Sequence, residues 1–214
     1  MTTRMQLQAE AYAHGTSTAP RFQIVDRYSP VRPAMEERIR RDFARHFSAR
    51  IAGFMPYLLK YDQSAGTGVL GFRPAAEEPL YLENYLDSPI ELFLANVLRM
   101  PVLRSEVVEV GQFVVDDRAS AAAMFRDLVP FLIETGHVWI AFTATRTIRC
   151  MLRRAGLSGL AIAAAREEKI RSQADDWGSY YSNDPQVVIG KLPDVGGHWC
   201  RSVRNRGRLL AAVE

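Results

Sequence analysis

The sequence predicts an α/β (α+β) fold, in which helices flank one mixed central sheet that is largely antiparallel at first and then parallel. Two observations predict this fold. Two strand-like segments joined by a short turn come early in the chain, and such neighbours pair antiparallel. After residue 105, β-branched segments alternate with segments whose apolar residues recur at helical spacing, which favours parallel or mixed pairing.

Composition and charge narrow the class of protein. With 214 residues, 48% of them hydrophobic and 24% charged, the chain can bury a core without a metal or disulfide. This composition excludes a mostly disordered protein. The net charge of +3 is too small to indicate nucleic-acid binding. Two cysteines, short apolar runs and no apolar signal core lead us to expect a cytoplasmic protein without stable membrane insertion.

We expect one domain over residues 21–195, because no repeat or low-complexity linker divides this segment. Residues 1–20 are polar, with scattered glycine, serine and threonine, and are expected to be flexible. Residues 196–214 contain several arginines and are expected to form a basic C-terminal tail.

The first elements are a helix and a hairpin. A helix is expected over 33–47, because its apolar residues recur every four positions and Pro33 suits a first helical turn. Residues 51–61 and 67–72 have strand-like patterns, and residues 62–66 form a turn between them. Together these segments predict an antiparallel pair of strands.

The next elements are a capped helix and a central strand. The sequence Ser-Pro-Ile-Glu at 88–91 predicts a capping box, with proline at the first helical position. Residues 106–115 are rich in valine and apolar on both faces, which is typical of a central strand. Simple alternation places Glu109 on one face with Val107, Gly111, Phe113 and Val115.

The remaining pattern alternates helices with strands. We expect Pro130 to kink or interrupt the next helix, Thr143 or Thr145 to cap the one after it, and Gly156 to end that helix. The expected elements are helix 119–135, strand 138–143, helix 146–155, strand 159–163, a charged helix 165–174 and strand 186–192.

Glu109 is the strongest candidate for chemistry. A carboxylate among valines on a central strand must be paired, protonated or functional, because burying a bare charge is costly. Burial raises a carboxyl pKa, and this tunes a general base towards neutral pH. A structural salt bridge to an arginine is an equally weighted alternative.

Two groups of residues follow the buried strand at 138–143. Thr143, Thr145 and Arg146 lie at its carboxyl end, where ligands of α/β folds gather. Arg149 and Arg153 share a helical stripe with Arg146, which could hold a phosphate or an acidic carrier protein. A solvated helix face is the alternative for this stripe.

Two further clusters are candidates for substrate binding. Glu83, Tyr85 and Asp87 lie among apolar residues, where they could hold an amine or anchor a loop. The aromatic cluster at 177–181, with Trp177, Tyr180 and Tyr181, could pack in the core or form a substrate wall. The four histidines are spread along the chain without ligand spacing, so we expect no metal site.

From about residue 38 to 191 the chain resembles the thermostable hemolysin family. The matching stretches are Phe54-Met-Pro-Tyr-Leu-Leu59, Gly71-Phe-Arg-Pro74, Tyr81-Leu-Glu-Asn-Tyr-Leu-Asp87, Val108-Glu-Val-Gly111, Phe142-Thr-Ala-Thr-Arg146 and Trp177-Gly-Ser-Tyr-Tyr181. A fainter similarity links the strand around Glu109 to the acyl-homoserine lactone synthases and the wider GNAT acyltransferase fold. Gln112 stands where those synthases carry arginine.

The resemblance implies a GNAT-like acyltransferase domain that moves an acyl group from acyl-CoA or an acyl carrier protein phosphopantetheine to an amine acceptor, in signal or specialised metabolite synthesis. Our hypothesis for this reaction takes Glu109, Thr143 and Arg146 as the catalytic residues. The expected substrate-binding residues are Arg73, Glu83, Tyr85, Asp87, Gln112, Thr145, Trp177, Tyr180 and Tyr181, and the expected donor-binding residues are Phe113, Val115, Arg149 and Arg153. A non-catalytic ligand- or partner-binding protein and a membrane-active hemolysin are the alternatives.

Overall fold

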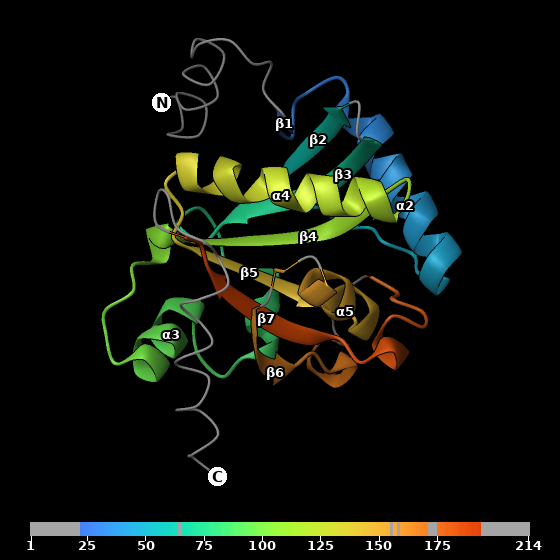
Figure 1. The fold of residues 1–214 in the computed structure, drawn as a ribbon. Helices are drawn as coiled ribbons and strands as arrows, with labels where there is room; N and C mark the ends of the chain where they lie inside the picture. Colours follow the sequence, from blue (N-terminus) through green and yellow to red (C-terminus); the bar gives the residue numbers. More distant parts are fainter. Residues whose placement is uncertain (1–21, 64–65, 155, 158, 171–174, 194–214) are drawn as a thin grey trace.

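The computed structural model describes residues 22–193 except 64–65, 155, 158 and 171–174 (Figure 1). The expected flexible N-terminus and basic C-terminal tail therefore lie outside the described residues. The strands are β1 Phe22–Val25, β2 Tyr57–Gln63, β3 Gly66–Pro74, β4 Val107–Val115, β5 Trp139–Ala144, β6 Leu160–Ala164 and β7 Gln186–Lys191. The helices are α2 Arg32–Phe47, α3 Ile90–Leu98, α4 Arg118–Glu134 and α5 Arg146–Arg154.

The seven strands form one sheet in the order β1-β2-β3-β4-β5-β7-β6. β4 and β5 are the parallel pair, and the other neighbours are antiparallel. The mixed sheet flanked by helices is therefore confirmed. None of the helices in the described part of the chain is long and apolar enough to cross a membrane.

Helices cover both faces of the sheet (Figure 1). α4 packs on one face through a cluster that contains Leu128 and Leu132. α2 packs on the other face, where Ile39 and Met35 are buried against β2 and β4. A third cluster joins α3 to the segment around residues 80–86 and to the β5 and β7 end of the sheet.

Several boundaries differ from the sequence-based expectation. Residues 51–56 precede β2 as irregular chain, because their backbone groups bond to side chains of other segments rather than to a strand. α3 begins at Ile90, and Ser88 forms no side-chain cap. Instead, Glu83 Oε1 accepts from the Ile90 amide at 2.8 Å. The strand β1 was missed, because only four residues form it.

Two predicted helices also need correction. α4 runs through Pro130 without interruption, since the proline lies on the exposed side, where water can satisfy the carbonyl that loses its amide partner. In the charged helix predicted over 165–174, residues 167–169 form only a 3₁₀ turn, and residues 171–174 lie outside the described part. Ala165 and Ile170 are the buried residues of its described half, too few for an amphipathic stripe.

A β-bulge in β4 changes the face that its last residues occupy. Val69 pairs with Val114 but Gly71 pairs with Gly111, so β4 has one extra residue opposite Leu70. Gln112 takes a φ of +50° at this place. As a result, Phe113 and Val115 pack on the α4 face with Val108 and Val110, and the predicted alternation with Glu109 is wrong beyond residue 111.

A buried arginine fixes the chain that leads into β2. Arg32 is 7% exposed and donates to the carbonyl oxygens of Met55 and Pro56, at 2.7 and 2.8 Å. Its Nε lies 2.7 Å from Glu36, one helical turn away. The first turn of α2 therefore holds residues 55–56 in place.

We expect Arg32→Met to lower the free energy of unfolding by about 2 kcal/mol or more, because two buried carbonyls lose their donors. Urea denaturation measures this change. Arg41→Met is the matched control, since Arg41 is exposed on the same helix and should change stability by less than about 0.5 kcal/mol. Equal effects of the two substitutions would contradict this role.

Candidate active site

A cavity of about 450 Å³ opens where β4 and β5 separate. Their pairing covers only Val107 to Glu109 against Trp139 to Ala141. Beyond this point, the residues of β4 that follow Glu109 have no partner in β5, and Val110 to Phe113 line the cavity on one side. Phe142 and Thr143 line it on the other. The separation of the two strands thus creates the site.

The cavity has two sides of different chemistry, one on each face of the sheet. We call the first the apolar side, which lies towards α4 and consists of Leu70, Val110, Phe113, Phe125, Leu128, Phe142 and Ile148. We call the second the carboxylate side, which includes Glu109, Arg73, Met55, Gly111, Tyr81, Tyr85, Asp175, Trp177 and Tyr180. A ligand in the cavity can therefore contact both an apolar wall and a polar wall.

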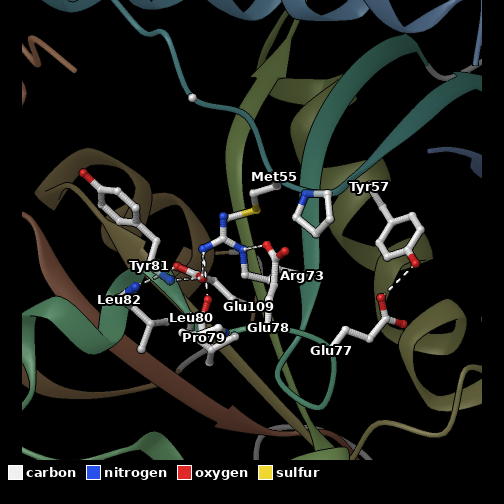
Figure 2. A network of polar contacts seen from close by, with 12 residues as sticks. Met55, Tyr57, Arg73, Glu77, Glu78, Pro79, Leu80, Tyr81, Leu82 and Glu109 are labelled. Carbon is white, nitrogen blue, oxygen red and sulfur yellow. Dashed lines mark hydrogen bonds and ion pairs between the residues drawn. The ribbon is translucent and has the colours of Figure 1, made fainter. Parts of the chain in front are cut away.

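Glu109 is the buried carboxylate of the second side. It is 2% exposed, and its two oxygens accept from the backbone amides of Tyr81 and Leu82 at 2.7 and 3.0 Å (Figure 2). Burial raises its pKa to about 7, although Arg73 and the two amides oppose the shift. Near neutral pH this group can therefore accept or release a proton.

Arg73 is shared between two carboxylates. It lies opposite Glu109 in the β3–β4 register, and its Nη1 is 3.6 Å from Glu109 Oε2. Its Nε lies closer to Glu78, at 2.9 Å from Oε1, in an ion pair that does not align as a hydrogen bond. Glu109 is thus paired only through a long contact, which leaves its pKa raised. The salt bridge to an arginine that the sequence analysis considered therefore exists, but Glu109 still lines the cavity.

The amides that hold Glu109 belong to a loop that Glu83 anchors. The Glu83 carboxylate accepts from the amides of Leu80 and Ile90, and it forms a two-point ion pair with Arg104. These contacts lower its pKa despite partial burial. Glu83 does not line the cavity, so the structure favours the loop-anchor interpretation over substrate contact.

Asp87 is also outside the cavity. Its side chain is 99% exposed and pairs with Lys169 at 3.0 Å. The structure therefore does not bring the two carboxylates of the segment 81–87 to the substrate position. Tyr85 of the same segment does line the cavity, where burial and its bond to the Tyr181 hydroxyl raise its pKa well above the ordinary value.

The aromatic cluster at 177–181 forms part of the wall. Trp177 and Tyr180 line the cavity, and the indole Nε1 of Trp177 donates to the Tyr81 hydroxyl at 3.1 Å. Tyr181 lies behind Tyr85, at 2.6 Å between hydroxyl oxygens, and burial raises its pKa to about 12. These phenols stay neutral at physiological pH, so they offer hydrogen bonds and aromatic surface but no charge.

The carboxyl end of β5 contributes two threonines. Thr143 and Thr145 both line the cavity, and the Oγ1 of Thr143 is buried without a hydrogen-bond partner among the described residues. Arg146, in contrast, is exposed at the start of α5 and does not line the cavity. The structure therefore does not place it beside Glu109.

The predicted donor-binding residues separate into two groups. Phe113 lines the cavity and stacks on Phe125 with ring centres 4.6 Å apart, whereas Val115 packs into the core. Arg149 donates to Ala144 and Asp184, which fixes α5 against the turn before β7. Arg153 is exposed and donates to Cys150 Sγ. Neither arginine lines the cavity.

Sequence reasoning missed the segment 52–55, all of which lines the cavity. Gln112, a predicted site residue, accepts from the Met55 amide and donates to the Gly53 carbonyl. Asp175, which was not predicted, accepts from the amides of Ala52 and Gly53. The sequence gives no signal for this arrangement, because the contacts join residues about 60 and 120 positions apart.

We expect Glu109 to make stability depend on pH. Its pKa is about 7 in the folded protein and near 4.5 when unfolded, so the folded state binds the extra proton between these values. The free energy of unfolding should therefore fall by as much as about 3 kcal/mol from pH 4.5 to 7.

Denaturation of the wild type and of Glu109→Gln across this range measures the contribution. In Glu109→Gln, the free energy of unfolding should not show this fall between pH 4.5 and 7, whatever the absolute stability of the variant. Parallel pH profiles for the two proteins would show that the folded pKa of Glu109 is not raised.

Comparison with solved structures shows a shared fold. TofI in a ternary complex with an inhibitor and MTA has 13% identity and a TM-score of 0.53, over 81% of this chain and 92% of that chain. FeeM, an N-acyl amino acid synthase from uncultured soil microbes, has 13% identity and a TM-score of 0.52, over 82% and 98%. The AHL synthase LasI has 10% identity and a TM-score of 0.51, over 80% and 91%.

No curated protein matches the sequence. The family model described as thermostable hemolysin matches residues 25–195, which includes every residue that lines the cavity. The chain therefore belongs to the thermostable hemolysin family.

Proposed function

We propose that this protein is an N-acyltransferase that moves an acyl group from a thioester to an amine. The observation that carries the proposal is the position of Glu109, a carboxylate with a pKa near 7 at a cavity between separated strands. A base with a pKa near the working pH is suited to remove a proton from an amine that attacks a carbonyl.

In the proposed reaction, the amine nitrogen attacks the thioester carbonyl carbon, and a C–N bond forms while the C–S bond breaks. Glu109 accepts the proton that the nitrogen loses, and the thiolate that leaves takes up a proton from solvent. The amides of Tyr81 and Leu82 and the Arg73 guanidinium hold the carboxylate in one orientation throughout. No oxidant, reductant or metal is needed for this step.

The donor fits the gap between β4 and β5. An extended pantetheine arm, from acyl-CoA or an acyl carrier protein, carries amide groups that can pair with an open strand edge. Beyond Glu109, β4 stays paired with β3 but has such an open edge on the side of β5. The Thr143 hydroxyl, which has no hydrogen-bond partner among the described residues, would bond the donor. Gln112, at the bulge of β4, holds the segment 53–55 through its side-chain amide. The apolar side of the cavity would then take the acyl chain.

Two solved structures of the same fold support this class of reaction. One is named an AHL synthase and another an N-acyl amino acid synthase, and the second name describes an acyl group on the nitrogen of an amino acid. Fold alone does not confer an activity, so the proposal depends on the chemistry of Glu109 and its cavity.

We expect Glu109→Gln to lower the acyl-transfer rate by about 10²–10⁴ because the general base is lost. The assay follows free thiol released from a panel of acyl-CoA and acyl carrier protein donors with a panel of amines. Glu134→Gln, an exposed substitution on α4, is the control that should keep the wild-type rate.

Thermal shift with the same donors separates an enzyme from a binding protein. A wild type that is stabilised by a thioester but never releases thiol would be a non-catalytic binding protein. A Glu109→Gln variant with the full wild-type rate would remove Glu109 from the mechanism.

A further inference from the structure

Met55 lies over a pair of glycines next to Glu109. Gly71 and Gly111 face each other in the β3–β4 register. A Cβ atom at Gly71 would lie 2.7 Å from Met55 Sδ, and one at Gly111 would lie 2.7 Å from Met55 Cε. The missing side chains of both glycines therefore make the notch that the Met55 side chain occupies.

The notch adjoins the carboxylate. Arg73 and Glu109 form the neighbouring pair on the same face, two residues after Gly71 on β3 and two residues before Gly111 on β4. Met55 is 6% exposed and lines the cavity together with Gly111 and Glu109. In Figure 2 its side chain points towards Arg73. An amine bound at Glu109 would therefore meet the Met55 thioether close to its nitrogen.

Hydrogen bonds hold the backbone of Met55 in place. The Met55 amide donates to Gln112 Oε1 at 3.1 Å, and its carbonyl accepts from Arg32 Nη2 at 2.7 Å. Asp175 holds the two residues Ala52 and Gly53 by their amides. The thioether is flexible and apolar, so it fills space by packing rather than by bonding. A change in its size should alter the cavity without moving the loop.

We propose that Met55 sets the size limit for the acceptor near its reacting nitrogen, so that the protein selects primary amines with an unbranched carbon next to nitrogen. This inference rests on the proposed function, because it takes Glu109 as the place where the amine nitrogen binds. A substituent on that carbon would point into the space that the Met55 thioether fills.

A second methionine provides a matched control. Met124 fills a similar notch at Gly68, where an added Cβ would lie 2.6 Å from its sulfur. Met124 is completely buried, but it does not line the cavity. Met124→Ala therefore removes the same atoms from a glycine notch without enlarging the acceptor site.

The probes are two isomeric amines, 2-phenylethylamine and 1-phenylethylamine, which carry the same charge and ring but differ in branching beside the nitrogen. Calorimetry gives their dissociation constants. The readout is the dissociation constant of the branched amine divided by that of the unbranched amine. We expect the wild type to favour the unbranched isomer by at least about tenfold, which is the usual effect of one misplaced carbon in a tight site. Met55→Ala should bring the ratio close to one.

Gly111→Ala should change the ratio in the opposite direction, because its methyl group pushes the end of Met55 into the cavity. Met124→Ala should lower stability and keep the wild-type ratio. An unchanged ratio in Met55→Ala, or a wild type that binds neither isomer, would overturn the inference.

The binding ratio also keeps this inference separate from the proposed function. If no thioester donor supports turnover but Met55→Ala still shifts the ratio, the acyl-transfer proposal fails and the size limit stands. If turnover occurs but Met55→Ala leaves the ratio unchanged, the acyl-transfer proposal stands and the size limit fails.

Discussion

A buried carboxylate needs partners, and the partners of Glu109 organise this side of the molecule. Two backbone amides and one long contact to Arg73 offset part of the cost of burying its charge. The part of that cost that remains raises the pKa of Glu109 to about 7. Those amides stay in place because Glu83 and Arg104 anchor the loop that carries them. The ionisation of Glu109 thus depends on a second carboxylate that never touches the cavity.

The cavity itself follows from a local irregularity in the sheet. The bulge at Gln112 adds one residue to β4, and the parallel pairing with β5 ends at Glu109. Bulges bend and twist a strand, which separates it from its neighbour. Gln112 also uses its side-chain amide to hold residues 53–55, which line the cavity. Gln112 therefore contributes both to the gap between the strands and to the position of residues that line it.

Regular features of the fold could be predicted from sequence. The period of apolar residues predicted α2, α4 and α5, and the valine-rich pattern predicted β4 as a central strand. Glu109 was predicted to be buried because of its neighbours on that strand, and it is. Alternation failed beyond Gly111, since a bulge depends on the pairing partner as well as on local sequence.

The sequence alone determined which elements form and that one carboxylate lies in the middle of a valine-rich strand, because these properties depend on neighbours within a few residues. Only the tertiary structure decided which polar residues meet. It brought Met55, Arg73 and Tyr81 to Glu109, and it kept Glu83, Asp87 and Arg146 out of the cavity. Such choices depend on the register and curvature of the sheet, which long-range packing sets and local patterns do not encode.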